Sequence, residues 1–254
     1  MTMGNDPRRP LAILSKFGVT HLHRQNPYMV AWWSAAFPGF GHYLLNQYFR
    51  ATLLTLIEVI INTLAHVNEA IVYTYCGKFE LAKSVLQPRW ALGYIIIYFY
   101  SIWDSYRSTL AQNKMCHLAE LENERLDCML FTSSEIQYLE QKKSVTAAIY
   151  SFFFPGLGQL YNHRFGLGIY AMVWWWIYVT LSRAHESLAM IIIGNIEESI
   201  SILHPHWLLF MPSVLGGAVY HAFITSKEHN RLFRLEQHQF LMERYQNFDT
   251  RSLS

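Results

Sequence analysis

The sequence predicts an all-α integral membrane protein, built as a tandem duplication of a three-segment helical unit with about six transmembrane helices. The first supporting observation is composition: the 254 residues are 52% hydrophobic and 16% aromatic but only 15% charged, whereas soluble domains carry roughly 25% charged residues. The second is patterning, because the charges gather near the two ends and in one central stretch and leave clean apolar segments between them. The third is an internal repeat.

The repeat appears when the chain is aligned with itself at an offset of 117 positions, without any gap. Residues 34–118 and 151–235 are identical at 18 of 85 positions, where chance would give roughly six for such an apolar composition. Phe37-Pro38-Gly39-Phe40-Gly41 returns in this alignment as Phe154-Pro155-Gly156-Leu157-Gly158. The predicted organisation is a polar basic tail (1–28), a first membrane repeat (29–118), a charged helical connector (119–141), a second membrane repeat (142–235) and a polar C-terminal tail (236–254).

Each repeat is predicted to hold three apolar segments and one interfacial piece. In the first repeat, residues 28–45 are apolar but interrupted by Pro38-Gly39, so they form either a kinked span or a re-entrant hairpin. An apolar helix over 51–65 follows, and then an amphipathic interfacial helix over 66–88, broken at Gly77. Pro88 restarts the chain, and 90–103 is a third apolar run with tryptophan at both ends. The same order is expected in the second repeat at 147–161, 166–181, 183–204 and 207–223.

The side of the membrane that the connector occupies stays open. Thr132 and Glu135 have the spacing of a capping box, which predicts a helical connector. For the chain as a whole, helix is expected to dominate, with no sheet. Three spans per repeat would invert the second copy and place the connector outside, with both basic termini in the cytoplasm. The basic residues near 107 and 142 instead favour the inside. Re-entrant Pro-Gly segments would make the copies parallel and every basic region cytoplasmic.

The second copy carries a recognisable motif. Residues 154–162 read FPGLGQLYN and continue as His163-Arg164-Phe165-Gly166-Leu167-Gly168. This stretch resembles bacterial multi-pass membrane proteins with a PGLGQLYNG two-helix module, a largely uncharacterised family in which glycine usually stands at the place of His163. The first copy is looser, with 41–46 reading GHYLLN. The resemblance implies membrane location and topology but no activity, and its structural motif residues are Pro38, Gly39, Gly41, Pro155, Gly156, Gly158, Tyr161 and Asn162.

Six acidic residues form a possible polar site: Glu58, Glu69, Glu80, Asp104, Glu186 and Glu197. Glu58 lies inside an apolar run, where an ionisable group is costly and is by default a functional hypothesis. Asp104 lies near the end of the third segment and Arg50 near the start of the second, so a buried pair is one alternative and a purely structural role is the other. The other four are two duplicated pairs, 69/186 and 80/197, which indicate either a solvated helix face or a gate between the repeats.

His204 and His206 are close enough to suggest a metal site, but the first copy has Gln87 and Arg89 at those positions. Interfacial imidazoles bonded to water explain them more simply, so no metal and no cofactor are predicted. The three cysteines have no paired spacing that would indicate disulfides.

The sequence has no phosphate-binding glycine loop, GxSxG, HExxH or CxxC pattern, which argues against an enzyme. Its formal charge of +2 gives no reason to expect nucleic acid. The predicted function is a non-enzymatic scaffold or accessory component of a membrane assembly. The expected partners are the lipid bilayer and other membrane proteins or further copies of the chain. An ion or small-solute transporter or channel with a site at the repeat interface is the alternative, and an intramembrane metal-dependent enzyme is a distant third. The expected location is the cell membrane, with several crossings and cytoplasmic termini.

Overall fold

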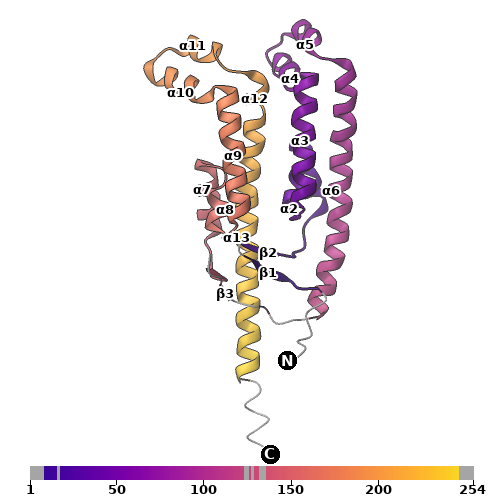
Figure 1. Ribbon diagram of the computed structural model, residues 1–254, viewed down its shortest axis with the longest axis vertical. Coiled ribbons are helices and arrows are strands. Elements are labelled where there is room, and N and C mark those ends of the chain that lie inside the picture. The colour runs from indigo at the N-terminus through magenta and orange to yellow at the C-terminus, as the bar shows by residue number, and fades with distance from the viewer. Residues whose placement is uncertain (1–8, 16–17, 123–125, 127–128, 132–135, 246–254) are drawn as a thin grey trace, which may run out of the picture. The chain divides into compact units, whose positions relative to one another are not determined.

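A computed structural model describes residues 9–15, 18–122, 126, 129–131 and 136–245, and most of them are helical (Figure 1). The chain divides into two compact units, which we treat separately. Unit 1 comprises residues 1–24, 111–169 and 219–254, and unit 2 comprises residues 25–110 and 170–218. The helices α6, α9 and α13 contribute residues to both.

Unit 2 is helical throughout its described residues. It holds α1 (Pro27–Ala36), α2 (Phe40–Leu44), α3 (Tyr48–Ala65), α4 (Val67–Tyr75), α5 (Phe79–Val85) and the first part of α6 (Pro88–Glu122), then most of α9 (Phe165–Ser182), α10 (Ala184–Ile193), α11 (Ile196–Ser201), α12 (Pro205–Leu208) and the start of α13 (Phe210–Tyr245). The predicted break at Gly77, which has a φ of 73°, and the restart at Pro88 are confirmed.

Unit 1 combines helices with two short antiparallel hairpins. Its helices are α7 (Ser144–Phe153), α8 (Leu157–Tyr161) and the C-terminal parts of α6 and α13. Its strands are β1 (Ala12–Ser15), β2 (Gly18–His21), β3 (Met129–Phe131) and β4 (Ile136–Tyr138), with Ala12 opposite His21 and Met129 opposite Tyr138.

These hairpins correct two expectations. The prediction of no sheet is wrong. Among the described residues of the connector, the helix α6 ends at Glu122 and the strands β3 and β4 follow. Two causes favour the strands β3 and β4. The segments Met129–Phe131 and Ile136–Tyr138 contain residues that favour strands, and β1 packs near both of them. The proposed cap at Thr132–Glu135 lies outside the described residues.

Each Pro-Gly motif turns the chain back on itself. Gly39 has a φ of 92° and Gly156 a φ of 110°, a conformation that glycine adopts at little cost. Two residues later, a side chain on Gly41 would collide with the carbonyl of Val30, and one on Gly158 with the carbonyl of Ala147. The helices α1 and α2, like α7 and α8, therefore form tight hairpins rather than kinked spans.

Three described helices are long and apolar enough to cross a membrane: Tyr48–Ala65, Phe165–Ser182 and the continuous stretch Pro205–Tyr245. Six such helices are not found among the described residues. Of the three predicted spans that this set lacks, one is the run over 90–103 in α6, and two are the Pro-Gly segments, whose helices α1 and α7 have 10 residues each. A helix of that length measures about 15 Å, against a hydrocarbon core of about 30 Å.

The two halves of the chain place their elements at the same offset of 117. The helices α1, α2, α3, α4, α5 and α6 begin 117 positions before α7, α8, α9, α10, α11 and α12. The left-handed residues follow the same rule: Asn46 (φ 61°) precedes His163 (φ 55°), and His66 (φ 56°) precedes Arg183 (φ 57°). The backbone amide of Gln87 donates to the carbonyl of Ala65 at 3.1 Å, as His204 does to Ser182.

Candidate functional site

The first polar cluster of unit 2 centres on Asp104 in α6. Its carboxylate accepts from Arg50 Nη1 at 3.0 Å and contacts His42 Nε2 at 3.1 Å. The His42 side chain is fully buried and the Asp104 side chain is 3% exposed, whereas half of the Arg50 side chain reaches solvent. Arg50 and Asp104 therefore form an ion pair that is buried at Asp104 and half exposed at Arg50, and His42, which the sequence analysis did not single out, joins it.

His42 occupies this place because of the Pro-Gly corner. The amide of Gly39 donates to Ser101 Oγ at 2.9 Å, which fixes the corner against α6. Three residues later along α2, His42 reaches Asp104, three positions beyond Ser101 on α6. The cluster thus bonds the hairpin to α6 and, through Arg50, to the start of α3.

The second polar cluster of unit 2 lies further along α3. Asn62 Nδ2 donates to Glu58 Oε1 and to Asn68 Oδ1, both at 3.0 Å, and the amide of Asn68 donates back to Asn62 Oδ1. Asn68 Nδ2 donates to the backbone carbonyl of His206 at 3.1 Å. Glu58 is 2% exposed and Asn62 is fully buried, so the chain of bonds links α3, α4 and α12 through the interior of unit 2.

Two oxygens near this cluster lack a hydrogen-bond partner in the described part of the chain. They are Oε2 of Glu58 and the phenol oxygen of Tyr178, both on buried side chains. Tyr178 belongs to the aromatic core of unit 2, where it stacks on Trp174 and contacts Phe210. An unsatisfied buried oxygen is costly, so each of these two atoms is a place where a proton, water or ion would be stabilised.

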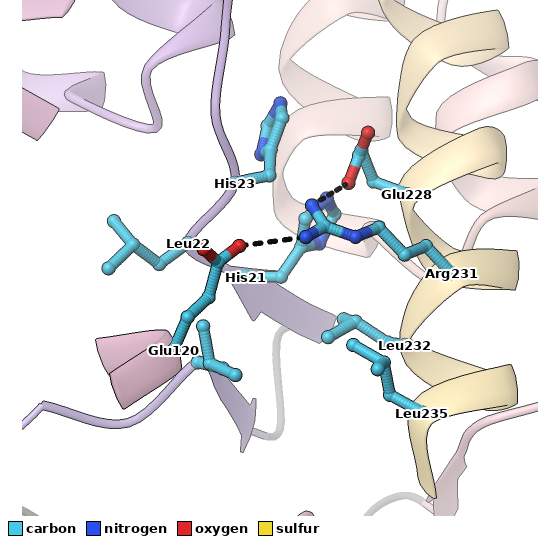
Figure 2. A pocket seen from close by; sticks show the side chains of 9 residues that line it. His21, Leu22, His23, Glu120, Glu228, Arg231, Leu232 and Leu235 are labelled. Atoms are coloured by element: carbon cyan, nitrogen blue, oxygen red, sulfur yellow. Dashed lines mark hydrogen bonds and ion pairs between the residues drawn. The ribbon is translucent and has the colours of Figure 1, made fainter. Parts of the chain in front are cut away.

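A pocket in unit 1 gathers charged and imidazole groups (Figure 2). It lies where the end of β2 and the residues after it meet the C-terminal part of α6 and the middle of α13. It is lined by Leu11, His21, Leu22, His23, Glu120, Glu228, Arg231, Leu232 and Leu235. Arg231 donates to Glu120 at 2.8 Å and approaches Glu228 at 3.6 Å. Arg24 also bonds the carboxylate of Glu120. The arginines and carboxylates of the pocket therefore neutralise one another.

The histidines of this pocket are held neutral. Burial, together with the nearby charge of Arg164, lowers the pKa of His23 to about 4, and burial beside His23 lowers the pKa of His21 well below its usual value. The two rings contact each other with their centroids 4.9 Å apart. Burial alone would raise the pKa of Glu120, but Arg231 and Arg24 hold that pKa below its usual value. The pocket thus combines an ionised carboxylate with uncharged imidazoles.

The duplicated carboxylates lie on helix surfaces and bond locally. Glu69 accepts from Tyr73 at 3.0 Å, Glu80 pairs with Lys83 at 3.0 Å, and Glu186 pairs with Arg183. Glu197 is exposed in the first turn of α11. These contacts match the solvated-face interpretation, and the structure does not bring the four carboxylates together with Glu58 or Asp104.

The two histidines suggested as metal ligands have other roles. His204 precedes α12 at its N-cap, and His206 Nε2 lies 3.0 Å from Thr63 Oγ1. Within the described ranges, no group of three or more histidine, cysteine or acidic side chains is arranged to hold a metal ion.

The motif residues of the second copy are structural in unit 1. Asn162 is fully buried and donates to the carbonyl of Ala222 at 2.8 Å. The hydroxyl of Tyr161 accepts from the amide of Lys143 at 3.2 Å. Together they connect the α7–α8 hairpin to α13 and to its own first residues.

Sequence reasoning missed the pocket of unit 1. The signal available was the alternation of His21 and His23 on either side of Leu22, but the partners on α6 and α13 are about 90 or more residues away and no spacing rule connects them. A scan against family models, a search of curated proteins and a search of solved structures found no match. The resemblance to the two-helix module therefore remains a prediction.

Proposed function

We propose that the protein is a multi-pass protein of the cell membrane and a non-enzymatic scaffold or accessory component of a membrane assembly. The supporting observation is how unit 2 uses its buried polar groups. Glu58, Asn62 and Asn68 bond to one another, and Asp104 is bonded by His42 and Arg50. Side chains engaged in such internal bonds hold helices together and are not arranged around a substrate.

The proposal includes a tandem duplication of one helical unit. It is supported by the ungapped 117-residue offset in sequence, in helix starts and in left-handed residues. His163 adds support for the resemblance to the two-helix module, because its φ of 55° is a conformation that glycine favours, and glycine is the residue that the module usually has there.

Each copy is proposed to cross the membrane twice. In the first copy we assign the crossings to α3 and to the apolar first part of α6. The helix α6 is not one of the three candidate spans, and it is included because its run over 90–103 is apolar with tryptophan at both ends. In the second copy the crossings are α9 and the stretch that begins at Pro205. The Pro-Gly hairpins re-enter on one side. An even number of crossings makes the copies parallel, so both termini and the connector lie in the cytoplasm, which agrees with their basic residues.

A transporter or channel is the second candidate. It is favoured by the unpartnered oxygens of Glu58 and Tyr178, because an ionisable group inside a membrane segment commonly marks an ion or proton path.

One experiment separates the two candidates. The purified protein and the E58Q variant are compared in mild detergent for complex formation and in sealed vesicles for flux of protons and monovalent cations. A scaffold should give the same stoichiometric complex or self-association for both proteins, with no flux. Flux that the E58Q variant loses, from a protein that stays a single copy, would overturn the scaffold proposal. Carbonate extraction of native membranes provides the prior test, and the protein should stay in the pellet.

A further inference from the structure

The α10–α11 hairpin carries a concentrated apolar surface. Ile192 is 78% exposed and Ile193 is 74% exposed at the end of α10, and Ile196 and Ile200 of α11 are each more than 60% exposed. Gly194, with a φ of 94°, forms the turn between the helices. In Figure 1 the hairpin projects sideways from the end of α9. Four exposed isoleucines within nine residues form an apolar patch of the kind that marks contact with a membrane or another protein.

The equivalent hairpin of the first half has the same backbone but a different surface. The helices α4 and α5 turn at Gly77 as α10 and α11 turn at Gly194. At the offset of 117, Ile191, Ile193 and Ile200 correspond to Thr74, Cys76 and Lys83. Lys83 forms a surface ion pair with Glu80 at 3.0 Å. The first hairpin also exposes Tyr75 and Phe79, at the positions of Ile192 and Ile196. What distinguishes the second hairpin is isoleucine at the positions of Thr74, Cys76 and Lys83, which the turn itself does not require.

The second hairpin is amphipathic. Ile196 and Ile200 are four residues apart and share one face of α11, whereas Glu197 and Glu198 point to another. Ser187 of α10 and Ser199 of α11 are buried, so small polar residues fill the space where the two helices meet. One side of the hairpin is thus left apolar while its carboxylates remain free to face water.

We propose that the α10–α11 hairpin inserts its isoleucines into the lipid acyl chains of the leaflet next to the C-terminal end of α9. This inference rests on the proposed membrane location and deepens it. The argument for lipid is continuity: α10 begins two residues after α9, a candidate span whose own Val173 and Trp176 are more than half exposed. A helix that leaves a membrane span at once lies at the hydrocarbon boundary, where an amphipathic hairpin is stable in the plane of the bilayer.

The chain offers a matched control for the test. Cys76 is exposed and lies at the position in the first hairpin that Ile193 occupies in the second. One variant keeps Cys76 and replaces Cys116 and Cys128 by serine. The other carries I193C together with serine at 76, 116 and 128. Both are purified, reconstituted into vesicles of phosphatidylcholine and phosphatidylglycerol that are then made permeable, and exposed to a charged maleimide.

Lipid insertion predicts that I193C reacts at least about tenfold more slowly than Cys76, because a charged reagent must leave water to reach the thiol. Both cysteines should react equally after denaturation. A fluorophore attached at I193C should be quenched by bromines on the acyl chains and not by iodide in water. Equal reaction rates, or protection of I193C only in native membranes and not in pure lipid, would overturn the inference; the second result would indicate a protein partner. Carbonate extraction of the same samples shows separately whether the membrane proposal has failed.

Discussion

The two halves of the chain share a backbone plan but differ in buried chemistry. Gly41 and Gly158 both press against a carbonyl of the preceding helix, and each lies near the hydroxyl of the matching Ser34 or Ser151. In contrast, Asp104 of the first half corresponds to His221, and its partner Arg50 to Leu167. His221 is buried and its Nδ1 lies 3.4 Å from Thr225 Oγ1. The comparison teaches that the hairpin corner requires the same small residues in both halves. The polar position on α6 and α13 does not require the same side chain, since it is Asp104 in one half and His221 in the other.

The largest expected effect comes from adding a methyl group at the shared corner. G158A places a Cβ against the Ala147 carbonyl, the Ser151 hydroxyl and the Ala222 side chain. Because backbone cannot yield as a flexible side chain does, we expect a loss of about 3 kcal/mol in the free energy of unfolding, or no folded protein. G41A should behave alike.

The matched control is G93A in α6, where the nearest atom to a new Cβ is 3.9 Å away. The apparent melting temperatures of all three variants are measured in mild detergent and compared. A G158A protein as stable as the G93A protein would show that the corner does not require glycine, and would contradict the similarity claimed for the two halves.

The next effect is the dependence on pH of the stability of the β1–β2 hairpin in unit 1. His21 and His23 have pKa values lowered by burial, that of His23 to about 4. Below about pH 6.5 the unfolded hairpin binds protons that the folded hairpin excludes, so stability is full above that pH and falls as the pH drops toward 4. His23 alone accounts for at most about 3 kcal/mol. The groups around the pair include Arg164, Arg231 and His229.

Hydrogen exchange of the Val19 amide, which donates to His163 at 3.3 Å, measures this loss after correction for the intrinsic exchange rate. The double variant H21Q/H23Q should show a smaller loss between these pH values, because it retains only neighbouring groups such as His229, whose pKa is also lowered to about 4. An equal loss in the variant and the native protein would mean that other groups carry the dependence.

The smallest expected losses of stability come from substitutions at Asp104 and at the matching position, His221. D104N removes the negative charge that His42 and Arg50 share, and we expect it to lower the free energy of unfolding by about 2 kcal/mol, since Arg50 is half exposed and recovers part of its hydration. H221N in the second half loses one long hydrogen bond and should cost about 1 kcal/mol. Thermal unfolding in detergent compares them. Equal losses would show that the charged cluster is no more important than its neutral counterpart.

Local signals in the sequence were sufficient for much of this fold. Pro38-Gly39, Gly77 and Pro88 interrupt helices for reasons that lie in those residues themselves. The places of Arg50 and Asp104 near the ends of neighbouring segments raised their pairing as one of two alternatives. The β1–β2 hairpin was missed because its four-residue strands are stabilised by tertiary packing, including the bond from Val19 to His163, which no local pattern reveals. Helix over 107–122 agrees with the predicted helical connector. Its continuity with the apolar run of α6 was not predicted, because hydropathy changes along this helix although helix propensity does not.

The side of the membrane on which the connector lies tests the central claim of parallel copies most directly. Cys128 lies in the connector, outside the described residues, and becomes the only thiol when Cys76 and Cys116 are replaced by serine. Two crossings per copy predict that a membrane-impermeant thiol reagent labels Cys128 only after the cells are made permeable. Labelling of Cys128 in intact cells would place the connector outside and contradict the account.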